Sequence, residues 1–122
     1  MTVFNLRKFI KSFLYAIRGV RCAFREQNFK VHIVFSIIVF VLILLFDPVV
    51  LEIAILVIII TFILVLEIIN SIFERIVDIL QPRVHPHAKT IKDMMAAAVL
   101  VASLGSFFVG LLIFLPYFKG II

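Results

Sequence analysis

The sequence lacks several features that would point to a soluble enzyme. It has no tryptophan, one cysteine, four glycines and four prolines among 122 residues. The single Cys22 excludes an intrachain disulfide, and there is no Gly-rich phosphate loop, HExxH zinc motif or Cys/His cluster. Without tryptophan, an aromatic belt at a membrane surface has to use Tyr15, Tyr117 and phenylalanine. The first thirty residues carry charges throughout, so we do not expect them to form a signal peptide.

Apolar residues dominate the sequence. They make up 65% of the chain, which includes 14 phenylalanines, and the mean hydropathy is +1.29. A soluble domain of this size could not bury so much apolar surface, because small domains have a poor surface-to-volume ratio. We therefore expect an all-α integral membrane protein that forms one domain over residues 1–122.

Long apolar runs predict three transmembrane helices, at about residues 29–46, 49–70 and 94–118. A tight turn should join the first two, because Pro48 disfavours helix at Asp47. The second helix can continue past the membrane surface to about Leu80, so that residues 79–92 form a cytoplasmic loop.

Residues 4–28 are expected to form an amphipathic helix on the membrane surface. Leu6, Ile10, Phe13 and Ile17 share one helical stripe, and basic residues occupy the other faces. A helix of this kind lies in the interface plane and is attracted to anionic lipid. The alternative is that the same stripe packs on the protein's own helical bundle.

The positive charge is distributed unevenly along the chain. The net charge is +5, with seven of the twelve basic residues before residue 31 and four between residues 75 and 92. Because cytoplasmic segments of membrane proteins are enriched in Lys and Arg, the N-terminus and the loop should be cytoplasmic and the C-terminus outside. This membrane interpretation accounts for the basic residues, so we expect no nucleic-acid partner.

A stripe of polar side chains follows the second apolar run. Glu67, Asn70, Glu74 and Asp78 are spaced 3, 4 and 4 residues apart, which places them on one face of a helix. Carboxylates near a membrane are costly unless they bind a metal, transfer a proton or pair with a cation. The stripe therefore favours an enzyme.

Two further polar clusters should converge on the same membrane side, at residues 26–28 and 92–93. Carboxylate and amide oxygens suit Mg²⁺, which keeps waters for a phosphate-bearing substrate. A lysine beside them can neutralise phosphate charge, and another carboxylate can act as a general base towards a hydroxyl. Together these residues supply the kinds of groups that phosphoryl transfer requires.

Each polar residue also has a structural alternative. Glu26 could pair with Arg25 or Lys30, and Asn70 could form a hydrogen bond between helices. Lys92 could simply anchor the third span at the interface.

The sequence also leaves the roles of the remaining polar residues undecided. Asp78 could pair with Arg75, or with Arg83 across the helix end. For His85 and His87, solvation in the loop and contact with a nucleotide are about equally favoured. His32 is expected to have a structural role at the interface.

Motifs across nearly the whole chain carry a resemblance to a known family. They are Glu26-x-Asn28-Phe29-x-x-His32, Glu67-x-x-Asn70-Ser71-x-x-Glu74-x-x-x-Asp78 and Lys92-Asp93-x-x-Ala96. The combination resembles the prokaryotic diacylglycerol kinase family, and the first motif resembles its Gram-positive branch of undecaprenol kinases. The resemblance implies a homotrimer of the bacterial inner membrane, with active sites shared between subunits. It also implies transfer of the γ-phosphoryl of MgATP to a membrane lipid alcohol.

The resemblance implies roles for individual residues. Glu26 and Glu74 would bind Mg²⁺, Glu67 would be the general base at the lipid hydroxyl, and Asn70 would orient the reacting groups. Four residues would contact the nucleotide: Arg83, His85, Lys92 and Asp93. The lipid contacts transfer more weakly, because the amphipathic segment differs most from the best-known diacylglycerol kinases; they are Lys8, Tyr15 and Glu67.

Three functions remain open from the sequence. The leading hypothesis is a kinase for undecaprenol, and the alternative is a kinase for diacylglycerol. A third hypothesis is a non-catalytic membrane scaffold or channel subunit, in which the polar stripe holds helices together.

The kinase and scaffold hypotheses make different predictions for Glu74→Ala. A kinase should consume ATP only when a lipid alcohol is present, and the variant should lose this activity while it keeps its fold. The measurement is ATP turnover in mixed micelles, with circular dichroism to monitor folding. Absence of turnover in the wild-type protein would support the scaffold instead.

Overall fold

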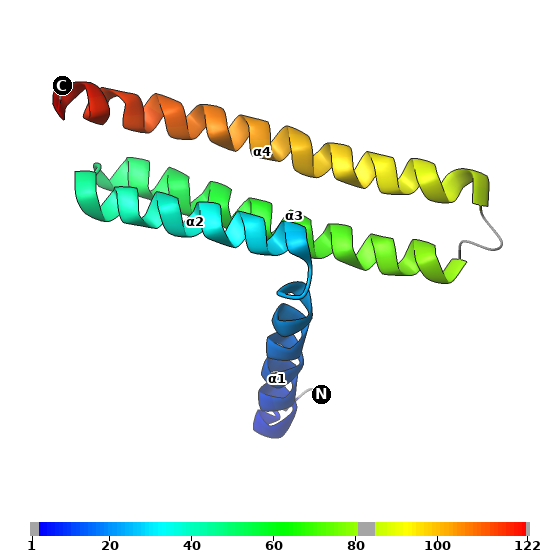
Figure 1. Cartoon of the computed structure of the whole chain (residues 1–122). Helices are drawn as coiled ribbons and strands as arrows, with labels where there is room; N and C mark the ends of the chain where they lie inside the picture. Colours follow the sequence, from blue (N-terminus) through cyan, green and yellow to red (C-terminus); the bar gives the residue numbers. More distant parts are fainter. Residues whose placement is uncertain (1–2, 81–84, 122) are drawn as a thin grey trace.

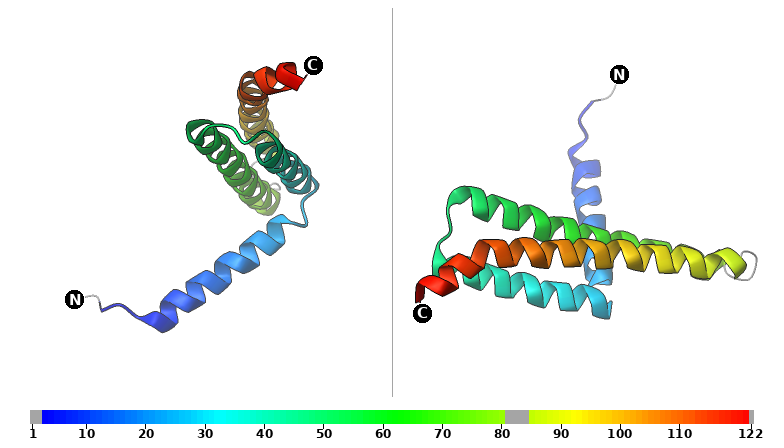
Figure 2. Two further views of the ribbon diagram at one scale, coloured as in Figure 1. Left: turned by 90° about the vertical axis from the view of Figure 1, so that its left-hand side faces the viewer. Right: turned by 90° about the horizontal axis from the view of Figure 1, so that it is seen from above.

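The computed structural model describes residues 3–80 and 85–121, and the regular structure in these ranges is helical (Figure 1). Four helices follow one another: α1 (Leu6–Ala23), α2 (Gln27–Phe46), α3 (Val50–Leu80) and α4 (His85–Ile121). Helices α2, α3 and α4 lie alongside one another as a bundle, and α1 projects away from it at a steep angle (Figures 1 and 2). These three helices are long and apolar enough to cross a membrane. The expected all-α, three-span architecture is confirmed.

The boundaries differ from the expectation mainly in the polar loop. The three spans expected from the sequence lie within α2, α3 and α4, and α3 continues to Leu80 as expected. Residues 85–92, however, form the first two turns of α4 rather than part of a loop over 79–92. Pro86 does not prevent this, because the first turn of a helix does not need the N–H that proline lacks. The surface helix is also shorter than expected, since α1 ends at Ala23.

Local hydrogen bonds define both ends of α1. The side-chain oxygen of Asn5 accepts hydrogen bonds from the backbone N–H groups of Arg7 (3.1 Å) and Lys8 (3.3 Å), which caps the helix. At the other end, the backbone N–H of Glu26 donates to the carbonyl of Ala23 at 3.0 Å. This tight connection lets α2 leave in a different direction from α1 (Figure 1).

Most apolar side chains of the single chain are exposed. The accessible surface is 9593 Å², whereas a folded soluble monomer of 14.0 kDa exposes about 6,700 Å². Large apolar residues such as Leu45 (71%) and Val101 (69%) face outwards from the bundle. Lipid, or other copies of the chain, must therefore cover the surface of the three spans.

Helix α4 packs on α3 along a narrow seam. Buried or half-buried residues recur on α4 at alternating intervals of four and three residues, which is the spacing of a helix–helix seam. They are Ala88, Lys92, Met95, Val99, Ala102, Ser106, Val109 and Ile113. The small residues Ala96, Ala97, Ala98 and Gly105 lie off this seam and are exposed.

A cluster of buried apolar side chains lies at the end of the bundle that carries the α2–α3 turn. Leu56, Ile113 and Phe114 form the buried cluster there. Phe46 at the end of α2 stacks edge-on against Phe118 of α4, with ring centroids 4.9 Å apart. The chain then turns at Asp47, which adopts the left-handed conformation (φ 45°) that aspartate tolerates better than most residues.

A side-chain hydrogen bond ties α4 to the start of α3 at the same end. The Tyr117 hydroxyl donates to Oε1 of Glu52 at 2.6 Å. The same carboxylate oxygen accepts from the backbone N–H of Val49 at 3.3 Å, and so caps the first turn of α3. One carboxylate therefore both starts α3 and holds α4 beside it.

Removing this hydrogen bond should lower stability without removing apolar packing. Tyr117→Phe is expected to reduce the melting temperature in detergent by about 2–5 °C, because a hydrogen bond to a charged acceptor is lost. Glu52→Gln keeps an acceptor for the hydroxyl and should cause a smaller reduction. Identical melting curves for wild type and Tyr117→Phe would show that the contact does not stabilise the fold.

Candidate active site

The first two residues of the polar stripe, Glu67 and Asn70, lie on the buried face of α3, whereas Glu74 is half-buried and Asp78 is exposed. The buried residues of this helix are Leu56, Glu67, Asn70 and Val77, separated by 11, 3 and 7 residues, so they share one face. Glu67 is 2% exposed and Asn70 is 6% exposed. Glu67 and Asn70 thus occupy positions on the helix face that otherwise packs apolar side chains.

Glu67 has a partner on α2. Nε2 of His32 lies 3.1 Å from Oε1 of Glu67, and the two side chains are 18% and 2% exposed. A buried carboxylate without a partner is strongly destabilising, so this contact explains how the helix accommodates Glu67. His32 was expected to have a structural role at the interface, and its contact with Glu67 was not anticipated from the sequence.

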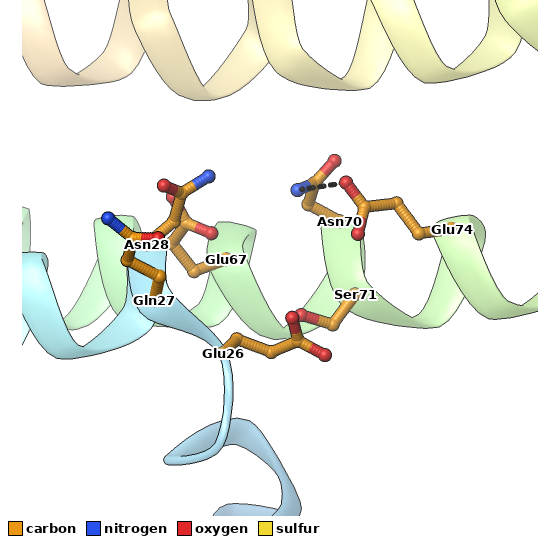
Figure 3. A pocket seen from close by; sticks show the side chains of 7 residues that line it. All are labelled: Glu26, Gln27, Asn28, Glu67, Asn70, Ser71 and Glu74. Carbon is orange, nitrogen blue, oxygen red and sulfur yellow. Dashed lines mark hydrogen bonds between the residues drawn. The ribbon is translucent and has the colours of Figure 1, made fainter.

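Seven residues of α2, α3 and the connection before α2 line a cavity of about 210 Å³, which we call the polar pocket (Figure 3). They are Glu26, Gln27, Asn28, Glu67, Asn70, Ser71 and Glu74. The pocket lies where α1 meets α2, beside the middle of α3 (Figures 1 and 3). The structure therefore brings together all four residues predicted for the metal, the base and the orienting amide.

Asn70 presents one unpaired oxygen within this pocket. Its Nδ2 group donates to Oε1 of Glu74 at 3.5 Å, as the dashed line in Figure 3 shows. Its Oδ1 atom is buried and has no hydrogen-bond partner among the described residues. An orphaned buried acceptor is costly, so Oδ1 is suited to receive a donor group or cation from a ligand.

The pocket has the donor chemistry of a Mg²⁺ site but not a complete set of ligands. Its charged groups are three carboxylates, and Mg²⁺ prefers oxygen ligands and retains several waters. Within residues 3–80 and 85–121, however, no three His, Cys, Asp or Glu side chains come close enough together to hold a metal ion. One chain can supply carboxylates to a cation, and waters or phosphate would have to complete the coordination.

Lys92, one of the residues predicted to contact the nucleotide, lies outside this pocket. Nζ of Lys92 on α4 lies 2.6 Å from Oδ1 of Asp78 on α3. Asp78 therefore forms an ion pair with a basic residue, and that residue is Lys92 rather than Arg75. Asp93 is exposed on α4, and neither Lys92 nor Asp93 lines the polar pocket.

The other ion pair of this region links the pocket rim to α3. Nη2 of Arg75 lies 3.9 Å from Oε1 of Glu26, with side chains 62% and 37% exposed. The pairing of Glu26 with Arg25 or Lys30 suggested by the sequence is replaced by a contact across two helices. Exposed pairs at this distance contribute little, so Glu26 remains free to exchange Arg75 for another cation.

Four other predicted residues are not placed in the pocket. Arg83 lies outside the described residues, and His85 is the first residue of α4 with its side chain outside them. Lys8 and Tyr15 are exposed on α1, where the guanidinium of Arg18 lies 5.7 Å from the Tyr15 ring centre. The proposed lipid contacts on α1 are therefore accessible but do not line the polar pocket.

A second cavity, of about 470 Å³, lies between α2, α3 and α4, and we call it the apolar groove. His32 is among its lining residues, and Phe118 marks the opposite end of the bundle. Its lining is almost entirely aliphatic and aromatic, apart from His32 and three serines. The polar pocket and the apolar groove thus adjoin at the contact between Glu67 and His32.

Four residues of this site appeared in the polar clusters or motifs of the sequence but were given no role in the chemistry. Gln27, Asn28 and Ser71 line the pocket, and His32 contacts Glu67. A signal was present for the pair on α2, because Asn28 and His32 are four residues apart and share a helical face. Ser71 gave no comparable signal, since it lacks the surroundings of a nucleophile.

The fold and the pocket define a class of small three-span membrane proteins with an oxygen-rich pocket beside the start of the first span. A family model described as prokaryotic diacylglycerol kinase matches residues 14–114. This match covers most of the chain, which therefore belongs to the prokaryotic diacylglycerol kinase family.

Individual relatives agree with this assignment. Undecaprenol kinase of Bacillus subtilis (strain 168) is 38% identical over 113 residues, covering 92% of this chain and 92% of that protein. Diacylglycerol kinase of Synechocystis sp. (strain ATCC 27184 / PCC 6803 / Kazusa) is 34% identical, covering 86% of this chain and 61% of that protein. Diacylglycerol kinase of Helicobacter pylori (strain J99 / ATCC 700824) is 30% identical, covering 80% of this chain and 77% of that protein. No solved structure matches the chain.

A charge added to the pocket should reveal whether it binds a cation. Asn70→Asp places another carboxylate beside Glu67 and Glu74, so without divalent cations its melting temperature should fall by roughly 5 °C. Millimolar Mg²⁺ should then raise the melting temperature of the variant more than that of the wild type.

The control is Asn5→Asp, which makes the same chemical change at the start of α1, where both residues cap a helix well. It should respond to Mg²⁺ as the wild type does. An equal Mg²⁺ response of all three proteins would show that the added carboxylate does not create or strengthen a cation site.

Proposed function

We propose that this protein is an ATP-dependent lipid kinase and that undecaprenol is its preferred acceptor. A relative whose match covers 92% of both chains is an undecaprenol kinase, which supports this acceptor. The observation that carries the proposal is the position of Glu67, a buried carboxylate where the polar pocket adjoins the apolar groove. A lipid alcohol has the matching chemistry, with one hydroxyl on a long apolar tail.

The proposed reaction needs a proton acceptor at the lipid hydroxyl. Glu67 would accept the hydroxyl proton while the oxygen forms a bond to the γ-phosphorus of ATP and the bond to the leaving ADP oxygen breaks. Oδ1 of Asn70, one helical turn away, would receive a hydrogen bond from a reacting group. Phosphoryl transfer depends mainly on positioning and charge stabilisation, which these buried, fixed side chains can provide.

We assign the nucleotide and Mg²⁺ to the opposite side of the pocket from the lipid tail. Glu26 and Glu74 would hold Mg²⁺, which neutralises phosphate charge when it is bound. Lys92 would contact the phosphates and Asp93 would assist on the nucleotide side, with Arg83 and His85 as further nucleotide contacts. Because Lys92 is bound to Asp78 at the protein surface, it would have to exchange this partner for phosphate.

The proposal includes a homotrimer in the bacterial inner membrane, with the N-terminus cytoplasmic. Two observations support shared sites. Lys92 and Asp93 do not line the polar pocket of their own chain, so another copy could supply them. The chain also exposes more surface than a soluble monomer of its mass and many of its large apolar side chains are exposed, so part of this surface is available to neighbouring copies.

Direct competition between acceptors tests the proposed substrate. The purified protein in mixed micelles with MgATP should transfer labelled γ-phosphate to both undecaprenol and diacylglycerol. The kcat/KM for undecaprenol should be higher by about tenfold, equivalent to about 1.4 kcal/mol in the barrier. A detergent-matched primary alcohol without a long tail serves as the control for non-specific transfer.

The two curated diacylglycerol kinases among the relatives support diacylglycerol as the second candidate. A tenfold preference for diacylglycerol would overturn the assignment to undecaprenol and keep the lipid kinase. Transfer to no lipid alcohol would overturn the kinase itself.

A further inference from the structure

The contact between His32 and Glu67 joins two cavities of different character. Glu67 lines the polar pocket, whereas His32 lines the apolar groove. Nε2 of His32 and Oε1 of Glu67 are 3.1 Å apart, and both side chains are largely shielded from solvent. A lipid hydroxyl that approaches Glu67 from the groove therefore meets this pair first.

We propose that His32 is a positioning residue that holds one carboxylate oxygen of Glu67, so that the other oxygen faces the reacting hydroxyl. This inference rests on the proposed lipid kinase function and deepens it. It gives α2 a part in the chemistry that neither the family match nor the relatives' names assign.

Hydrogen-bond chemistry determines which group donates. An ionised carboxylate can only accept, so in the proposed arrangement Nε2 of His32, which lies 3.1 Å from Oε1 of Glu67, would carry the hydrogen and donate it. A carboxylate has two oxygens, and holding one of them restricts rotation about the terminal side-chain bond. Oε2 is then left to accept a proton, and its direction is set by a residue on another helix.

The helical context keeps His32 itself in place. It lies in the second turn of α2, whose start packs by way of the buried Phe29 against the ring of Phe24 (centroids 5.1 Å apart). The hydroxyl of Ser36 donates to the backbone carbonyl of His32 at 2.7 Å, one turn further along. His32 therefore stands on a regular helix, which supports precise positioning better than a loop would.

Two substitutions separate positioning from bulk packing. His32→Ala should lower kcat for the lipid alcohol by about 10- to 100-fold, the effect of losing a hydrogen bond to a charged group. The KM for ATP should stay unchanged, because His32 does not line the polar pocket. His32→Gln retains an N–H donor that can reach Glu67, and it should recover most of the lost kcat.

A second test asks whether the effect of replacing His32 depends on the Glu67 carboxylate. In a Glu67→Gln background, where the carboxylate is absent, His32→Ala should cause little further loss of the residual rate. Thr61→Val is the matched control, because it removes a 2.8 Å hydrogen bond within α3 at an exposed position away from both cavities. This variant should retain the wild-type kcat.

The outcomes distinguish this inference from the proposed function. If the wild type phosphorylates a lipid alcohol and His32→Ala is equally fast, the positioning role is wrong and the kinase stands. If His32→Gln is as slow as His32→Ala although both melt at the wild-type temperature, the positioning role is also wrong. A wild-type protein that phosphorylates no lipid alcohol overturns the proposed function, and the inference with it.

Discussion

The cost of burying the Glu67 carboxylate organises the centre of this protein. The side chain is 2% exposed on a helix that is otherwise suited to lipid, and His32 on α2 provides its partner at 3.1 Å. Without such a partner the ionised group would be strongly destabilising there. The contact therefore requires α2 and α3 to pair in one register, and that register also brings Glu26 to the same pocket as Asn70 and Glu74.

The α2–α3 turn and the region where α2 begins differ in the side chains that they bring together. At the α2–α3 turn, aromatic packing around Phe46 and the hydrogen bond from Tyr117 to Glu52 tie all three long helices together. Near α1 the helices enclose a polar pocket, and α3 and α4 extend beyond the start of α2 (Figure 1). The α2–α3 turn thus holds the three long helices together, whereas the region where α2 begins leaves polar groups accessible to ligands.

Much of the architecture could be predicted from the sequence, because apolar runs long enough to cross a membrane have few alternatives to helix. The turn at Asp47-Pro48 followed from the steric effect of proline on its preceding residue. The expected loop over 79–92 was too long, because prolines in a polar segment do not exclude helix when one falls in its first turn. The membrane orientation stays a prediction.

The sequence by itself determined the three spans, the N-terminal amphipathic helix and the face of α3 that carries Glu67, Asn70 and Glu74, since helical periodicity relates residues within one helix. The tertiary structure decided which residues meet across helices: His32 with Glu67, Arg75 with Glu26, and Lys92 with Asp78. Such contacts depend on the register and crossing of separate helices, which a periodic pattern in one segment does not specify. The positioning role proposed for His32 could be inferred only from that packing.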